Sequence, residues 1–404
     1  MIVSSSAAPH ENRALRVLIA ADTFAPNVNG AARFTERLAT GLARRGHQVH
    51  VACPSADGAE RVESFGGATV HRIRSRRIPV HEDFRICLPW QANAAADRIL
   101  ERARPDIVHA QSHFLIGRAL LRAAERNGIP AVATNHFMPE NLLAYAHLPR
   151  MLHRTAMRLA WRDLGRVFGT ASTVTTPTEL AAELLRDNGF PGSVRAVSCG
   201  IDTESYRGHG SVRPGTVLFV GRLDQEKRVE ELLAAVARIE PGIAARVEII
   251  GDGSCRAELE RRSRELGIAE RVSFHGFVSE QELRAAYARA EVFCMPGIAE
   301  LQSLATLEAM SSGTAILAAN AVALPHLVRE GENGWLFTPG DITELAEKLR
   351  AVLGTPGTSA RMGEASGRLA AGHALEKTLA TFEEIYTAQL PSPREPARVL
   401  SPVA

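Results

Sequence analysis

The sequence predicts an α/β protein made of two Rossmann-like domains, each built on a parallel sheet. A chain of 404 residues is long for one domain and suits two of roughly 150 to 200 residues each. Short apolar runs alternate with segments of helical periodicity, and this alternation occurs in two successive series. Residues 207–215 are rich in glycine and separate the two series as a linker would.

Each element follows from a local pattern. In the first series we expect strands at 15–21, 49–53, 107–110, 130–134 and 172–176. A first helix should stop at Gly46 after two arginines, and a second should cover 115–126. In the second series we expect strands at 216–220, 246–250, 272–274, 292–295 and 315–318, with helices over 229–239, 342–353 and 373–390.

Composition excludes several classes of protein. Hydrophobic residues make up 45% of the chain and charged residues 23%, which is typical of a soluble globular protein, and no apolar run is long enough to span a bilayer. The N-terminus has no signal-peptide pattern, so we expect a cytoplasmic protein. The 5 cysteines are far apart and predict buried thiols rather than disulfides or a zinc site. A net charge of +2 gives no support for nucleic acid.

Two glutamates, Glu300 and Glu308, follow the strand expected at 292–295. Glu300 should lie in the loop at the carboxyl edge of that strand, and Glu308 should lie in the next helix. If the helix begins early, the two carboxylates share one face and can hold two hydroxyl-bearing parts of one ligand, such as two sugar rings. The helix N-terminus between them would face a phosphate. Alone, the pair fits equally well two solvated glutamates on a surface helix.

Several spaced motifs resemble the family-4 glycosyltransferases, which transfer a sugar from a nucleotide diphosphate sugar with retention at the anomeric carbon. Glu300 and Glu308 match the family's Glu-x7-Glu element, and residues 221–227 match its Gly-Arg-Leu…Lys turn. Residues 200–202, 251–253 and 274–278 are similar to further family elements, so the resemblance covers 15–388. It implies the GT-B fold, in which two Rossmann-like domains face each other across a cleft.

The resemblance also implies roles for single residues. Arg222 and Lys227 would bind the diphosphate, Glu300 the hexose and Glu308 the ribose, while His136 would hydrogen-bond the transferred sugar. Cations beside a departing diphosphate stabilise the charge that develops in the transition state. His109 and His113 are expected to shape the same cleft. The complete set expected to bind the donor is Gly30, Gly276, Phe277, Val278, Gln302, Ser303, Leu304 and Glu308. The chain has no Asp-x-Asp, so neither a metal nor another cofactor is expected.

Two segments depart from the family pattern. In the loop after the first strand, Gly30 is followed by Ala31, where the family has two glycines. A single glycine there also argues against a nicotinamide enzyme, whose fingerprint needs Gly-x-Gly-x-x-Gly. The family often has Phe-Gly where this chain has Gln302 and Ser303, and we expect the extra amide and hydroxyl to alter which hexose fits.

Composition and the resemblance together assign a role to each part of the chain. We expect a flexible tail, an N-terminal acceptor domain, a linker, a C-terminal donor domain, a helix returning to the N-terminal domain and a disordered tail. Their expected ranges are 1–13, 14–198, 199–215, 216–371, 372–390 and 391–404 respectively.

A basic amphipathic helix is expected from residue 150 onward. Its arginines are four residues apart and form one oblique stripe, Arg150, Arg154, Arg158, Arg162 and Arg166. Opposite them we expect the apolar residues Leu152, Leu159, Leu164 and Phe168. Such a helix can rest on an anionic membrane surface. The alternative is an ordinary surface helix whose apolar side packs in the core.

Together these patterns predict a retaining, metal-independent hexosyltransferase that uses a UDP- or GDP-sugar. The segment at 135–141 resembles those of bacterial diacylglycerol and phosphatidylinositol glycosyltransferases. The expected acceptor is therefore a membrane lipid, such as diacylglycerol or a phosphatidylinositol glycolipid, at the inner face of the membrane. A soluble acceptor, such as an inositol phosphate, an aminocyclitol or a natural product, remains an alternative. A non-catalytic nucleotide-sugar sensor is a third possibility, disfavoured by the complete set of site residues.

Overall fold

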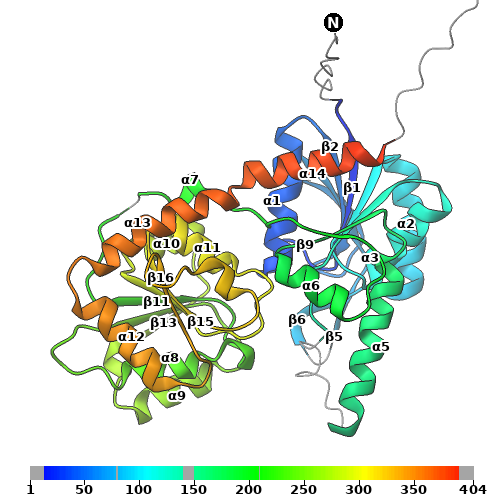
Figure 1. Ribbon diagram of the computed structural model, residues 1–404. Helices are drawn as coiled ribbons and strands as arrows, with labels where there is room; N and C mark the ends of the chain where they lie inside the picture. The colour runs from blue at the N-terminus through cyan, green and yellow to red at the C-terminus, as the bar shows by residue number, and fades with distance from the viewer. Residues whose placement is uncertain (1–12, 79–80, 140–149, 209, 391–404) are drawn as a thin grey trace, which may run out of the picture. The chain divides into compact units, whose positions relative to one another are not determined.

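The computed structural model describes residues 13–78, 81–139, 150–208 and 210–390. It contains two large sheets, each with helices on both faces (Figure 1). The chain forms two compact units. One comprises Met1–Thr134, Arg166–Val174 and Phe382–Ala404, and the other comprises Asn135–Gly165 and Thr175–Thr381. His136 and the segment around Cys199 therefore belong to the same unit as Lys227 and Glu300.

The first sheet has eight strands in the order β10-β9-β8-β7-β1-β2-β4-β3. The pairings from β8 through β7, β1 and β2 to β4 are parallel, and β3 is antiparallel to β4. Apolar side chains fill both faces of its central strands, as expected for a parallel sheet covered by helices. The strands are β1 (Arg16–Ala20), β2 (Gln48–Pro54), β3 (Arg61–Phe65), β4 (Ala68–Ile73), β7 (Ile107–Ala110), β8 (Ala131–Thr134), β9 (Thr173–Thr176) and β10 (Val194–Ala196).

Helices connect most of these strands. Asn29 caps the first helix by accepting a hydrogen bond from the backbone N–H of Ala32, and Pro89 occupies the first turn of the second, where its missing N–H has no cost. A small antiparallel hairpin, β5 (Arg76–Ile78) and β6 (His81–Ile86), lies between β4 and α2 in sequence. The helices are α1 (Gly30–Arg44), α2 (Pro89–Ala103), α3 (Leu115–Arg126), α5 (Arg150–Phe168) and α6 (Glu179–Asp187).

The second sheet has six strands in the order β13-β12-β11-β14-β15-β16, and all its pairings are parallel. One continuous apolar core surrounds it. Because the strands are parallel, the loops that follow them gather at one edge. The strands are β11 (Thr216–Val220), β12 (Arg246–Ile250), β13 (Val272–Gly276), β14 (Val292–Met295), β15 (Ala315–Ala319) and β16 (Gly334–Phe337).

The helices around the second sheet form two groups. Helix α8 packs with α9 and α12, whereas α11 packs with α7 and α13. The terminal helix α14 begins after a short 3-10 turn and is the long orange-red helix of Figure 1. The helices are α7 (Thr203–Tyr206), α8 (Val229–Val236), α9 (Arg256–Glu265), α10 (Glu280–Arg289), α11 (Leu304–Ser311), α12 (Ile342–Gly354), α13 (Thr358–Ala370) and α14 (Leu375–Gln389).

The structure confirms the predicted α/β class and the two parallel sheets. The predicted helix at 229–239 is shorter, because regular helix ends at Val236, and the terminal helix begins at Leu375 rather than at 373. The predicted tails lie outside the described residues apart from Arg13, and the predicted domain limits remain a prediction. No helix among the described ranges is both long and apolar enough to cross a bilayer.

Candidate functional site

The candidate site is formed by loops at the carboxyl edge of the six-stranded sheet. The loop after β11 is joined to the loop after β12 by a hydrogen bond from the Leu223 N–H to the Asp252 carbonyl, 2.9 Å long. The Gly251 N–H donates to the Gly276 carbonyl at 2.9 Å, which ties in the loop after β13. The Ile298 N–H donates to the Glu226 carbonyl at 3.0 Å. Backbone bonds thus connect the loops that follow four adjacent strands.

Glycines allow this close backbone contact. A Cβ on Gly251 would lie 1.9 Å from the Gly221 carbonyl oxygen, and the residue has a φ of +124°, which other residues rarely adopt. A Cβ on Gly253 would lie 2.6 Å from the Leu223 carbonyl oxygen. The motif at 251–253 therefore has a structural role, because only glycine lets the loops after β11 and β12 meet.

Lys227 and Glu300 form an ion pair between the loops after β11 and β14. The Lys227 ammonium donates to Glu300 Oε1, and both side chains are largely buried, with 15% and 13% exposed. A short 3-10 turn, Gln225–Lys227, positions the lysine, and the Ala323 N–H holds the Glu300 carbonyl at 3.2 Å. Two residues predicted from separate motifs are thus in direct contact.

Arg222 lies in the same loop as Lys227 and is more exposed. Its guanidinium contacts Asp224 at 2.8 Å and Glu226 at 3.0 Å, and 43% of its side chain is exposed. Asp224 is buried and also accepts from the Ser254 backbone and hydroxyl. Sequence reasoning assigned no role to Asp224, which lies between Arg222 and Lys227, and no sequence signal distinguishes it from Glu226 in the same motif.

The loop after β13 contributes an exposed aromatic ring. Gly276 adopts a φ of +65° and turns the chain out of the strand. Phe277, the next residue, is 66% exposed, whereas Val278 packs against the core. Arg256 of α9 lies beside this turn and pairs with Asp252 at 2.9 Å. An exposed phenyl ring beside backbone polar groups is suited to contact a flat ligand.

Glu308 is not on the same helical face as Glu300, because α11 begins only at Leu304. The structure thus confirms Glu300 in the loop and Glu308 in the helix, and the condition for a shared face, an early start of the helix, is not met. Ser303 caps the helix through its hydroxyl, which accepts from the Thr306 N–H at 3.3 Å, so helical structure cannot extend back to Glu300. Glu308 is buried in the second turn, and its Oε2 accepts from the Tyr287 hydroxyl at 3.1 Å.

Gln302 and Ser303 use their side chains inside the protein. The Gln302 amide bonds to Cys199 N–H at 2.8 Å and to Ser198 Oγ at 3.1 Å, and Ser303 caps α11. We expected these two side chains to influence which hexose fits. In the structure both instead form hydrogen bonds within the protein. Only their backbone N–H groups, with that of Leu304, remain available at the N-terminus of α11.

His136 follows β8 and lies beside Cys199. Its Nδ1 is 4.0 Å from the Cys199 sulfur, and burial lowers the pKa of the imidazole to about 4. The ring is therefore neutral near pH 7 and can exchange hydrogen bonds without carrying a charge. His136, Cys199 and Gln302 thus form one group with the loop that carries Glu300.

Gly30 is the first residue of α1 and belongs to the other compact unit. Its backbone does not adopt a positive φ, and an added Cβ would meet no atom within 4 Å among the described residues. Neither the turn nor the packing of this unit therefore requires glycine at this position.

His109 and His113 are buried core residues, and their expected part in shaping the cleft stays a prediction. His109 is fully buried. Its Nδ1 hydrogen-bonds to the Tyr386 hydroxyl of α14 at 2.6 Å, and its Nε2 hydrogen-bonds to the Thr134 hydroxyl at 2.6 Å. His113 is buried against the rings of Phe114 and Phe168. Both histidines hold helices against the eight-stranded sheet.

Helix α5 is arranged differently from the expected basic stripe with an opposite apolar face. Leu164 and Phe168 are buried, but Leu152 and Leu159 are 48% and 59% exposed, and Met151 is 83% exposed. Arg154, Arg158, Arg162 and Arg166 are exposed as well, while the side chain of Arg150 lies outside the described residues. Large apolar side chains and arginines therefore share one solvent-facing surface. No residue from 151 to 160 is buried.

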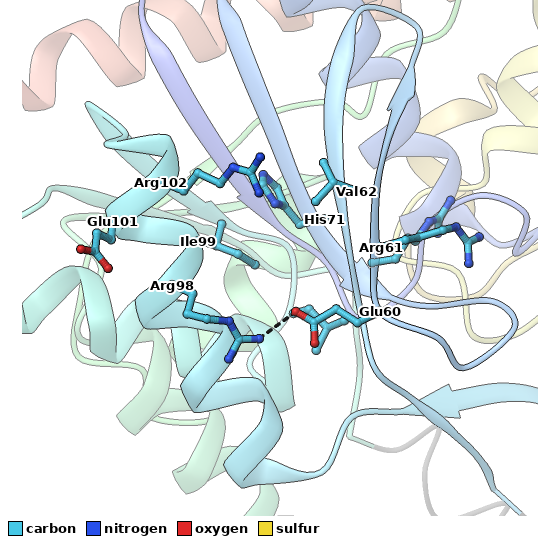
Figure 2. A pocket seen from close by; sticks show the side chains of 10 residues that line it. Glu60, Arg61, Val62, His71, Arg98, Ile99, Glu101 and Arg102 are labelled. Atoms are coloured by element: carbon cyan, nitrogen blue, oxygen red, sulfur yellow. Dashed lines mark hydrogen bonds and ion pairs between the residues drawn. The ribbon is translucent and has the colours of Figure 1, made fainter.

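A separate hollow of about 440 Å³ lies between α2 and the strands β3 and β4 (Figure 2). Arg98 on its rim pairs with Glu60 at 2.8 Å, and two further arginines of its lining, Arg61 and Arg72, pair with Glu63. Carboxylates thus already hold three of its four arginines. In the described part of the chain, no group of three or more His, Cys, Asp or Glu is placed to hold a metal.

Comparison with known families supports this picture. Residues 28–205 match the model described as Glycosyltransferase Family 4, and residues 204–368 match the model described as Glycosyl transferases group 1. A GDP-mannose-dependent alpha-mannosyltransferase of Mycolicibacterium smegmatis is 30% identical over 80% of this chain and 84% of its own length. The chain belongs to the family-4 glycosyltransferases of the GT-B fold. It is thus a glycosyltransferase that uses a nucleotide sugar.

Relatives in this family differ in what they act on. The chain is 28% identical to sulfoquinovosyl transferase SQD2 of Arabidopsis thaliana over 75% of its length, but it spans only 60% of that relative. It is 24% identical to alpha-monoglucosyldiacylglycerol synthase of Streptococcus pneumoniae, covering 85% of this chain and 79% of that one. It is 29% identical to D-inositol 3-phosphate glycosyltransferase of Streptomyces scabiei, covering 70% and 68%.

Solved structures show the same fold. Sucrose-phosphate synthase from Thermosynechococcus elongatus superposes with a TM-score of 0.78 at 20% identity, covering 92% of this chain and 98% of that one.

Three histidines with lowered pKa values predict a loss of stability in mild acid. Burial is the main cause that lowers the pKa of His71, His136 and His373 to about 4, against about 6.5 in an unfolded chain. Between these values the unfolded chain binds protons that the folded protein does not, so the free energy of unfolding decreases as pH falls from 6.5 toward 4. We expect a lower urea midpoint at pH 5 than at pH 7, and a smaller difference in His373→Gln. An equal difference in both proteins would contradict these assignments.

Proposed function

We propose that this protein is a retaining, metal-independent hexosyltransferase that moves a hexose from a UDP- or GDP-sugar to a lipid at the inner face of the membrane. The observation that carries the proposal is the contact between Lys227 and Glu300 at the carboxyl edge of the six-stranded sheet. Arg222 lies in the same loop, and Phe277 lies in the loop after β13. Two cations, Lys227 and Arg222, and one carboxylate proposed to bind the sugar, Glu300, are thus held by one set of connected loops.

The two cations suit a nucleotide diphosphate. When the anomeric C–O bond breaks, its electron pair passes to the diphosphate, and negative charge grows there. Lys227 is held in place by Glu300, and Arg222 by Asp224 and Glu226, so the protein pairs these charges before a donor binds. A diphosphate brings at least two negative charges to the same cations and competes for them, which leaves the Glu300 carboxylate to accept hydrogen bonds from hexose hydroxyls.

His136 and α11 complete the proposed site. A neutral imidazole with a pKa of about 4 is suited to hydrogen-bond a sugar hydroxyl and is a poor base for removing a proton near pH 7. The backbone N–H groups at the start of α11 offer further donors to the donor sugar or phosphate. Retention, the family's mode of transfer, is consistent with the alpha-products in the names of the relatives.

A lipid acceptor is supported by helix α5. Met151, Leu152 and Leu159 are exposed among the arginines of the same solvent-facing surface. Such a surface gains free energy by inserting apolar side chains at the acyl boundary while the arginines meet anionic headgroups. The relative named as a monoglucosyldiacylglycerol synthase points the same way. A soluble phosphorylated acceptor is the second candidate, favoured by the relative named as an inositol 3-phosphate glycosyltransferase.

Loss of either member of the ion pair should strongly reduce turnover. We expect Glu300→Gln and Lys227→Ala each to lower kcat by at least about 100-fold, since one preorganised transition-state contact is typically worth on the order of 3 kcal/mol. The assay is sugar transfer, or donor hydrolysis, with a panel of UDP- and GDP-sugars. Glu258→Gln, on the exposed face of α9, serves as a matched control and should leave kcat unchanged. Near-normal kcat in both site variants would refute the assignment.

Chelation should not affect the reaction. Because Arg222 and Lys227 supply the positive charge at the diphosphate, we expect the same initial rate with excess EDTA as with added Mg²⁺ or Mn²⁺. A rate that is lost in EDTA and restored by either ion would show that the two cations are insufficient.

Membrane binding should depend on the exposed leucines of α5. We expect the protein to co-sediment with vesicles that contain phosphatidylglycerol, less so as salt rises, and the double variant Leu152→Ser, Leu159→Ser to bind several-fold more weakly. Leu180→Ser on α6, a leucine 36% exposed, is the control. Equal binding by the double variant and the control, together with transfer to a soluble inositol phosphate, would favour the second candidate.

A further inference from the structure

Gln302 is buried at a junction of three chain segments. It lies in the loop that carries Glu300, residues 296–303, which we call the Glu300 loop. Its Oε1 accepts from the Cys199 N–H at 2.8 Å, and its Nε2 donates to Ser198 Oγ at 3.1 Å. Both partners belong to residues 197–201, which we call the connector because they precede the second parallel sheet in the chain. One side-chain amide thus joins the Glu300 loop to the connector.

The connector is held on its other side by the start of α14. Ser198 Oγ contacts His373 Nδ1 at 2.9 Å, and the Thr378 hydroxyl donates to the Ser198 carbonyl at 2.9 Å. The Ile201 N–H donates to the His373 carbonyl at 3.0 Å, and its carbonyl accepts from the Leu375 N–H at 2.8 Å. A Cβ on Gly200 would lie 2.9 Å from Leu375 Cα. The connector is therefore fixed to the start of α14 by several hydrogen bonds.

The same connector reaches His136. The Cys199 residue whose N–H binds Gln302 also places its sulfur 4.0 Å from His136 Nδ1. Cys199 is only 5% exposed, and its backbone N–H donates to the Gln302 side chain. A buried donor without an acceptor is unfavourable, and the segment has to shift to satisfy it.

We propose that Gln302 is a positioning residue, which fixes the Glu300 loop to the connector and thereby sets Glu300 relative to His136. This inference rests on the proposed function, in which both residues contact the hexose. It assigns to the Gln302 amide an internal task and not the recognition of a particular sugar, because both ends of the amide are occupied within the protein. Loss of the amide should then lower kcat and leave the preference among donor sugars unchanged.

The test compares Gln302→Met, Ser198→Ala, the double variant and a control, Gln281→Met, on the exposed surface of α10. Methionine keeps the length of glutamine and removes both hydrogen bonds. We expect Gln302→Met to reduce kcat by about 10-fold or more, since small misplacements of reacting groups have large effects on rate. Affinity for nucleotide diphosphate and the ratio of rates with different hexoses should not change. The effects of the two substitutions should combine to less than their product in the double variant, because both break the Gln302–Ser198 contact.

A second measurement does not need turnover. Alkylation of Cys199 by iodoacetamide, followed by mass spectrometry, should be at least several-fold faster in Gln302→Met than in the wild type and in the control. The fully buried Cys53 and Cys294 serve as internal references, because general unfolding would expose them too. A Gln302→Met protein with normal kcat and normal Cys199 protection would overturn the proposal. A changed hexose preference would show instead that Gln302 reads the sugar. Failure of the proposed function is a different result, in which Glu300→Gln retains full kcat.

Discussion

Direct backbone contact between the loops after β11 and β12 is the constraint on which the candidate site depends. Gly251 and Gly253 have no side chain to separate these loops, so Leu223 can bond to Asp252 and the turn that carries Arg222 and Lys227 is fixed. A larger residue at 251 would meet the Gly221 carbonyl at 1.9 Å and displace the turn. The positions of both cations therefore follow from the close packing of two loops at the edge of a parallel sheet.

An ion pair adds a second constraint to the candidate site. Lys227 and Glu300 come from different loops and are largely buried, so each compensates the other's charge where water is scarce. The protein thus holds a cation for a phosphate and a carboxylate for a sugar in one contact. His136, kept neutral by burial, adds a polar group without altering this charge balance. Gln302 connects the Glu300 loop to the connector beside His136 through hydrogen bonds to Ser198 and Cys199.

The sequence predicted the fold better than the arrangement of the candidate site residues. Strand periodicity located β7, β11, β12 and β14 at their observed bounds, because buried parallel strands are continuous apolar runs. The family motifs pointed to Lys227 and Glu300, which are in contact. The sequence could not show that Ser303 delays the start of α11, that the Gln302 amide faces inward, or that His109 meets Tyr386. The last two depend on partners far away in the chain, whereas the cap is a local contact between Ser303 and Thr306. In α5 likewise, the periodicity of the sequence cannot show which leucines pack against another segment and which are exposed.

The most direct test of the central claim is hydrogen exchange, followed by mass spectrometry, with and without saturating UDP or GDP. If a nucleotide diphosphate binds at the carboxyl edge of the six-stranded sheet, backbone amides in residues 221–228, 276–278 and 297–304 should exchange more slowly when it is present. Exchange in β15 and β16, away from the loops of the site, should not change. Protection confined to the hollow beside α2, or to the eight-stranded sheet alone, would contradict the account.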